Sequence, residues 1–268
     1  MKSTDTTFAG SIPELYDRHL GPILFDPYAI VTARRLAAFP HDTVLEVAAG
    51  TGILTRRMVE NLPAARIVAT DLNQPMLEHA RLKHRMSGVT FRQVDACDLP
   101  FADAAFDLVL CQFGVMFFAD KILGFQEARR VLKPGGRFIA TVWASLAENA
   151  LAETVVNTLA DRFPEDPPGF LARVPHGYHD PDRIRGDLEA AGFRRIIVET
   201  ITLPTRPATH RDPAIGFCQG TPTRAEIENR DPDDLQAATE AVADAIAARF
   251  GAEQIDATMQ AHMIIASG

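Results

Sequence analysis

Three acidic side chains close successive apolar runs in the first hundred residues. Glu46 ends VLE and is followed by VAAGTG, Asp71 ends RIVATD, and Asp95 ends VTFRQVD. The carboxyl ends of parallel strands meet at one edge of a sheet, and this edge is where α/β proteins bind ligands. Glycines allow close backbone approach, and the N-terminus of the following helix suits an anionic group. These spacings predict one ligand site surrounded by three carboxylates.

The residues of this loop limit which charged ligand it can bind. A dinucleotide loop carries G-x-G-x-x-G, but residues 50–55 read GTGILT and lack the third glycine. Glu46 would repel a pyrophosphate, and it suits a cationic group such as an α-ammonium. Asp71 can accept hydrogen bonds from ribose hydroxyls, and Asp95 can accept one from the exocyclic amine of adenine. S-adenosylmethionine carries an amine, a ribose and an adenine, which these three acids would contact in that order.

The elements that must position these acids alternate along the chain. Expected strands lie at 43–48, 66–71, 89–95, 106–113, 136–143, 194–203 and 259–267. Helical patterns cover 53–62, 75–86, 121–132, 147–162 and 234–250, and another helix begins at its cap Asp180 and ends near Gly192. Short connections between such elements predict a Rossmann-like α/β fold, a mostly parallel sheet with helices on both faces.

Two regions are expected to lie outside this alternation. Residues 1–40 predict a helical N-terminal cap in which Gly21-Pro22 ends one helix and Asp26 caps the next. Residues 41–268 form the expected α/β core, with lid insertions at about 144–180 and 202–258. Within the second insertion, residues 204–233 hold five prolines and are expected to be irregular.

Composition excludes several classes of protein. The 268 residues carry a net charge of −8 and no long basic run, so a nucleic-acid partner is not expected. No segment reaches the roughly 18–20 apolar residues of a membrane span, and the N-terminus has no signal-peptide core. The three cysteines match no metal or disulfide spacing, and they predict free thiols in a reducing cytoplasm.

The quoted runs also resemble a known family. The successive motifs of class I S-adenosylmethionine-dependent methyltransferases are similar to five segments here: VLEVAAGTG, ATDLNQPML, VDACDLPF, FDLVLCQFGVMFF and RVLKPGGRF. Within that family the segments most resemble the ubiquinone/menaquinone-biosynthesis-like branch. The resemblance is strong over residues 40–143. It implies a seven-stranded sheet of order 3-2-1-4-5-7-6, in which strand 259–267 runs antiparallel between the fifth and sixth strands.

The resemblance also implies roles for individual residues. Those around the methionine part of the cofactor are Glu46, Ala48, Gly50, Gly52 and Gln112, the last of these near the sulfonium. Those around the ribose and adenine are Asp71, Leu72, Met76, Asp95 and Ala96. Tyr16, in the N-terminal cap, covers the cofactor. Ala48 stands where the family often has a glycine, and we expect its backbone to avoid positive φ.

The expected function is methyl transfer from S-adenosylmethionine to a small apolar or aromatic molecule by in-line displacement. His19, His176 and His179 are the candidate bases, and no metal is expected, because Asp180 serves as a helix cap. The alternatives are a non-catalytic cofactor-binding regulatory module and an NAD-type oxidoreductase. Oxygen, nitrogen, carbon and sulfur acceptors all suit the scaffold, and the chain is expected to be a monomer or a homodimer.

Overall fold

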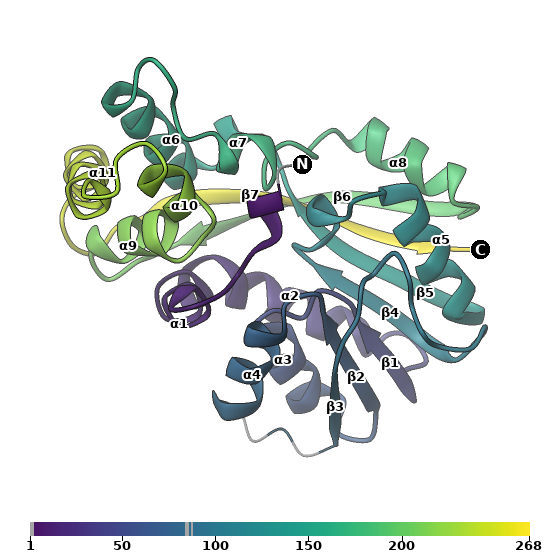
Figure 1. Ribbon diagram of the computed structural model, residues 1–268. Coiled ribbons are helices and arrows are strands. Elements are labelled where there is room, and N and C mark those ends of the chain that lie inside the picture. Colours follow the sequence, from purple (N-terminus) through teal and green to yellow (C-terminus); the bar gives the residue numbers. More distant parts are fainter. Residues whose placement is uncertain (1–2, 84–85, 87) are drawn as a thin grey trace.

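Short apolar and β-branched runs form the seven strands of one sheet. The computed structural model describes residues 3–83, 86 and 88–268 (Figure 1). Its strands are β1 (Thr43–Glu46), β2 (Arg66–Asp71), β3 (Val89–Gln93), β4 (Phe106–Gln112), β5 (Leu132–Trp143), β6 (Arg195–Thr205) and β7 (Ala257–Ser267). Their order is β3-β2-β1-β4-β5-β7-β6. This order confirms the predicted topology.

The register of the sheet sets where the site can form. β1 pairs in parallel with β2 and β4, whereas β7 pairs antiparallel with both β5 and β6. Glu46, the last residue of β1, pairs with Leu110 of β4 and Ala69 of β2. The chain therefore leaves three neighbouring strands at the same edge, and their loops diverge over one crevice.

Helices cover both faces of the sheet. Figure 1 shows α2 (Asp26–Leu36), α3 (Ile53–Asn61) and α4 (Gln74–Lys83) on one side, and α5 (Lys121–Val131) and α8 (Pro181–Ala190) on the other. Asp180 caps α8 as predicted, because its side chain accepts from the Asp182 N–H. Val44 and Leu45 of β1 are fully buried, as expected for a strand covered on both faces.

The N-terminal region departs from expectation at Gly21-Pro22. After α1 (Ile12–Leu15) the chain continues through a π-helical segment, η2 (Tyr16–Phe25), directly into α2. Pro22 does not break this run, because the wider π turn uses hydrogen bonds five residues apart, such as Asp26 N–H to Gly21 O. The prediction that Asp26 caps a new helix was also wrong. Its carboxylate accepts from Arg56 and Arg57 of α3 instead.

The segment expected to be irregular contains two helices. It holds α9 (Arg211–Gln219) and α10 (Thr223–Glu228), followed by α11 (Leu235–Phe250). Pro213 lies in the first turn of α9 and Pro222 immediately precedes α10, positions where a missing N–H costs nothing. Figure 1 shows these helices gathered beside α6 (Ala150–Arg162) and α7 (Phe170–Arg173) at one end of the sheet.

The remaining elements are single turns. They are η1 (Ser3–Thr6), η3 (Val115–Phe117) and η4 (Leu146–Glu148). Across the described residues, none of the helices has both the length and the apolar character needed to cross a bilayer.

Candidate cofactor and acceptor site

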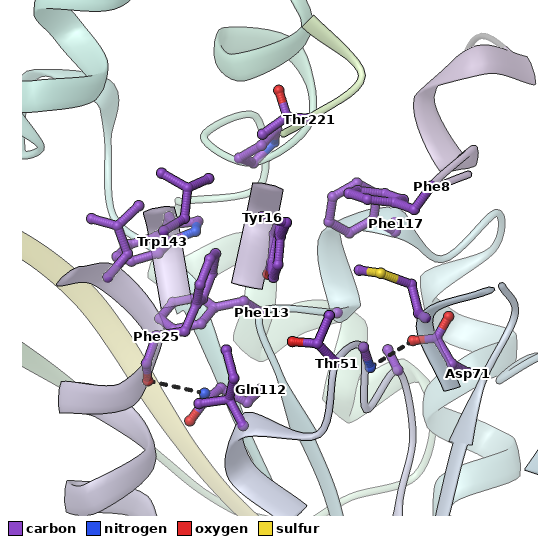
Figure 2. Close-up of a pocket in the computed structure, with 18 of the residues that line it drawn as sticks. Phe8, Tyr16, Phe25, Thr51, Asp71, Gln112, Phe113, Phe117, Trp143 and Thr221 are labelled. Atoms are coloured by element: carbon purple, nitrogen blue, oxygen red, sulfur yellow. Dashed lines mark hydrogen bonds between the residues drawn. The ribbon is translucent and has the colours of Figure 1, made fainter. Parts of the chain in front are cut away.

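A cavity of about 270 Å³ opens at the carboxyl edge of β1, β2 and β4. Its wall combines the loops after these strands with the N-terminal cap and with helices α6, α7 and α9. Figure 2 shows Asp71 and Thr51 at one end of the cavity and Phe25, Phe113 and Trp143 at the other, with Tyr16 between them. The site therefore joins a polar end, which Phe8 and Phe117 also border, to an aromatic end.

The loop after β1, residues 47–52, forms the floor of the polar end. Its backbone turns through positive φ at Ala48 (54°), Gly50 (57°) and Gly52 (79°). The expectation that Ala48 avoids positive φ was wrong. The neighbouring loop after β4 presses against it, because a Cβ at Gly114 would lie 2.4 Å from the Ala48 Cβ. Surrounding packing thus holds Ala48 in a conformation that a non-glycine residue rarely adopts.

Glu46 lies beneath this loop with 1% of its surface exposed. Its Oε2 accepts a hydrogen bond of 2.5 Å from Thr55 Oγ1. Burial raises the pKa of Glu46 to about 8, and the nearby charge of Asp71 adds to the rise. Among the described residues no Lys or Arg pairs with this carboxyl group, although Glu46 lines the cavity. The position fits a ligand that brings its own positive charge.

Asp71 ends β2 and is also buried, at 7% exposed. Its two oxygens accept from backbone N–H groups, Oδ2 from Gly50 and Oδ1 from Asn73, each at 2.8 Å. Burial raises its pKa, and these hydrogen bonds oppose the rise. Each carboxylate oxygen has two lone pairs. Asp71 therefore fixes the Gly50 turn and keeps capacity to accept from two hydroxyl groups.

The other residues expected around the cofactor lie on the same wall, with one exception. Those that line the cavity are Tyr16, Ala48, Leu72, Met76, Asp95, Ala96 and Gln112. Gly52 is not on the wall, and its neighbours are Ala80 and Met86 on the outer side of the loop.

Gln112 and Tyr16 both line the cavity, and each contacts Phe25. The Gln112 Nε2 donates to the Phe25 carbonyl at 3.3 Å, but its buried Oε1 has no partner in the described part of the chain. Tyr16 stacks on Phe25 with ring centroids 4.7 Å apart. Burial raises the pKa of Tyr16, and the charges of Asp71 and Asp17 raise it further. Tyr16 is thus a neutral phenol at the boundary between the two ends.

The three histidines proposed as bases lie in different surroundings. His176 lines the cavity, whereas His19 and His179 do not. His19 Nδ1 contacts Asp212 at 3.1 Å, and His179 Nδ1 lies 2.7 Å from the His176 carbonyl. The structure therefore brings one of the three to the site.

The aromatic end is built from residues far apart in sequence. Phe113 and Trp143 stack with ring centroids 3.9 Å apart, and Phe25 and Tyr28 pack against this pair. Phe113 reaches this position from a backbone φ of 53°. Phe25, Phe113 and Trp143 thus form an aromatic wall on the same side of the cavity as the Gln112 side chain (Figure 2).

Several lining residues were not predicted from the sequence. They are Thr6, Phe8, Phe25, Asn73, Phe217 and Thr221. Phe8 arrives through the N-terminal segment, where its N–H donates to Asn73 Oδ1 at 3.2 Å, and Phe217 and Thr221 arrive through the region expected to be irregular. Only Asn73 could have been suspected, because it lies two residues after the acid that ends β2.

A sheet of this order, with acids at the ends of its first strands and a glycine turn above a buried carboxylate, defines the class I methyltransferase fold and its cofactor site. Comparisons with known proteins agree. Residues 45–140 match the family described as "Methyltransferase domain". The chain is 32% identical over 174 residues to the ubiquinone/menaquinone biosynthesis C-methyltransferase UbiE of Saccharophagus degradans, covering 59% of this chain and 70% of that protein.

Two further relatives extend the comparison. The demethylmenaquinone methyltransferase of Deinococcus radiodurans is 33% identical over 178 residues, which cover 60% of this chain and 71% of that protein. Among solved structures, phosphoethanolamine N-methyltransferase 2 of Haemonchus contortus in complex with S-adenosyl-L-methionine superposes with a TM-score of 0.60 at 18% identity, covering 95% of this chain and 56% of the other. That likeness concerns the fold alone.

The chain belongs to the class I S-adenosylmethionine-dependent methyltransferases, in the ubiquinone/menaquinone-biosynthesis-like branch. It is an enzyme that uses S-adenosylmethionine as its cofactor. The resemblance seen in the sequence is thereby confirmed, and the alternatives of a non-catalytic module and an NAD-type oxidoreductase lose their support.

Proposed function

We propose that the enzyme transfers the methyl group to a small, neutral molecule of apolar or aromatic character by in-line displacement. The lining of the cavity carries this proposal, because its described wall has carboxylates at one end, aromatic rings at the other, and neither Lys nor Arg. A phosphate or carboxylate on the acceptor would be desolvated without a counter-charge. A neutral ring instead gains contact with Phe113 and Trp143.

In this proposal the polar end holds the cofactor. Glu46 would accept from its α-ammonium, Asp71 from its ribose hydroxyls, and Asp95 with Ala96 would meet the adenine edge. Leu72 and Met76 would flank the adenine. Bound S-adenosylmethionine supplies a methyl carbon on a positively charged sulfur, which leaves as a neutral thioether.

The middle of the cavity would place the reacting groups. Gln112 Oε1 is a buried acceptor without a partner among the described residues, and Tyr16 covers the same space from the cap. The rigid Phe113–Trp143 stack would hold the acceptor ring facing this point. Orientation of this kind is worth roughly 7–11 kcal/mol in well-aligned reactions.

His176 is the residue proposed to contact the polar atom of the acceptor. Its Nδ1 lies 2.9 Å from the Ala144 carbonyl, which can only accept, so Nδ1 carries the hydrogen and Nε2 keeps its lone pair. Burial lowers the pKa of His176 to about 4, so the ring is neutral at pH 7. A neutral imidazole is suited to accept a hydrogen bond from an O–H or N–H of the acceptor and thereby orient it.

The surrounding helices would act as a lid. We propose that residues 1–40 form a cap over the cofactor and that the insertions at about 144–180 and 202–258 close over the acceptor. Asp5 of η1 and Glu226 of α10 both bind Arg173 of α7, so the N-terminal segment and two lid helices are tied together. Such closure excludes water from the reacting atoms.

The named activities of the relatives support the acceptor class. Two of them are named as methyltransferases of ubiquinone/menaquinone biosynthesis and of demethylmenaquinone. A quinone nucleus is a neutral, flat ring, which matches an aromatic wall without cations. We therefore place quinol-like and phenolic molecules first among the acceptors to test.

The test is methyl transfer from isotopically labelled S-adenosylmethionine to a panel of phenols, quinols, amines and phosphorylated amines, followed by mass spectrometry. We expect labelled product from neutral aromatic acceptors. Product from only charged acceptors would overturn the proposal. His176→Gln should lower turnover roughly tenfold to a hundredfold, the value of one buried hydrogen bond, while S-adenosylhomocysteine affinity is unchanged. His179→Gln, off the cavity, is the matched comparison.

A further inference from the structure

A buried acid outside the cavity holds the glycine turn in place. Asp17 of η2 is 4% exposed and does not line the cavity. Its Oδ1 accepts from the hydroxyl group of Thr51 at 3.0 Å. Thr51 is itself 1% exposed, and it is the residue between the two glycines of the turn. Asp17 therefore contacts the cofactor loop through the side chain of Thr51.

The second oxygen of Asp17 is anchored on a different element. Oδ2 accepts from His79 Nε2 at 3.2 Å and from Lys83 Nζ, both on α4. α4 also carries Met76, whose Cε faces the Gly50 turn at 3.8 Å from a Cβ built there. One carboxylate thus joins the N-terminal cap, the glycine turn and the helix after β2.

The turn is consequently fixed from two sides. Asp71 holds the Gly50 N–H at 2.8 Å, and Asp17 holds the next residue through its hydroxyl group. Ala48 precedes these contacts in a strained conformation of φ 54°. A turn that stores strain keeps its shape only if its surroundings over-determine it, and hydrogen bonds to a charged acceptor are the strong ones.

The π-helical geometry of η2 makes this contact possible. Gly21 lies one turn after Asp17, and a Cβ at Gly21 would lie 3.3 Å from Ile53 Cδ1 and 3.7 Å from Asp17 Oδ1. The cap therefore approaches the start of α3 closely enough for Asp17 to reach the loop. Tyr16, the preceding residue, lines the cavity from the same segment.

We propose that Asp17 is a positioning residue that sets cofactor affinity through the Thr51 hydroxyl, so that seating of the cap and the shape of the cofactor loop are coupled. The inference rests on the proposed function only in placing the cofactor against residues 47–52. A cap that moves away would release Thr51, and a loosened turn would hold the cofactor less well.

The test is calorimetric titration of the full chain with S-adenosylhomocysteine, together with thermal melting. Asp17→Ala and Thr51→Val should each weaken binding about tenfold, as expected when one charge-assisted hydrogen bond is lost. The double variant should bind no more weakly than the single ones, because both changes remove the same bond. Thr51→Ser, which keeps the hydroxyl group, should restore affinity to within about twofold.

Lys83→Met is the control for a purely structural role. It removes an ion pair from Oδ2 and leaves the bond to Thr51, so it should lower the melting temperature with little change in affinity. Equal loss of affinity in Lys83→Met and Asp17→Ala, or additive losses in the double variant, would overturn the inference. Unchanged affinity in Asp17→Ala, when Asp71→Ala weakens binding, would likewise overturn the inference. If both variants leave affinity unchanged, the placement of the cofactor fails instead, and the two failures are told apart.

Discussion

Cofactor binding should release a proton from Glu46. Burial raises the pKa of Glu46 to about 8 in the empty protein, so its carboxyl group is protonated at pH 7. An α-ammonium group needs the ionised form as its partner. The ionised fraction is about 1% at pH 6 and about half at pH 8. The apparent affinity for S-adenosylhomocysteine should therefore rise roughly 50-fold between these two values.

The matched variant is Glu46→Gln, which keeps the shape and removes the titration. It should bind more weakly than the parent at pH 8 by roughly 1.5–3 kcal/mol, the value of a charged hydrogen bond. Its affinity should vary little between pH 6 and 8. Any remaining variation belongs to other groups, including the amine of the ligand, and corrects the parent curve.

The assay is calorimetry at pH 7 in phosphate and in Tris, whose ionisation enthalpies differ. The difference in heat should correspond to about 0.9 proton released per ligand in the parent and to almost none in Glu46→Gln. A parent protein that releases no proton would refute the reasoning. Equal release from both proteins would assign the proton to another group.

The same pKa predicts the stability of the empty protein. The folded state holds the Glu46 proton more tightly than the unfolded state, in which the pKa of this carboxyl group is 4.5. The stabilisation is fully present below about pH 4.5 and is lost as the pH rises through 8. Thermal melting should show Glu46→Gln gaining stability relative to the parent from pH 6 to 9. A constant difference over this range would contradict the shift.

Three further changes test the polar end and the lid. Asp71→Ala should weaken S-adenosylhomocysteine binding by roughly 1.5–3 kcal/mol, and unchanged affinity in a titration would mean that the ribose lies elsewhere. Asp95→Ala should cost less and should erase the preference for S-adenosylhomocysteine over an analogue without the adenine amine; an equal loss for both ligands would contradict that role. Arg173→Met removes the guanidinium shared by Asp5 and Glu226. In denaturant unfolding it should lower the free energy of unfolding by roughly 1–3 kcal/mol. An unchanged midpoint would mean that these ion pairs contribute nothing to stability.

The sheet and the polar end could be predicted because local sequence determines them. Asp71 and Asp95 follow apolar runs, and the end of a parallel strand places them at the ligand edge whatever the rest of the chain does. The strand order came from the family resemblance and was confirmed. The conformation of Ala48 could not be foreseen, because its positive φ depends on the loop containing Gly114, 66 residues later, which packs against it.

The helices of the cap and the lid were harder to predict, because a proline can interrupt a helix, begin one or lie within a π-helical run. Pro22 lies within a π-helical run that tolerates it, and Pro213 and Pro222 begin helices instead of interrupting them. Asp17 was invisible for another reason. Its bond to Thr51 spans 34 residues and depends on how η2 docks, which no local pattern encodes.

The position of β7 has a consequence for how the enzyme is made. This strand lies between β5 and β6, but on a ribosome it emerges after all the other strands. Until it arrives, β5 presents an unpaired edge and β6 has no partner strand, which favours aggregation and chaperone binding. Trp143, the single tryptophan, pairs with Ala261 of β7. Its fluorescence should therefore report the docking of β7 against β5.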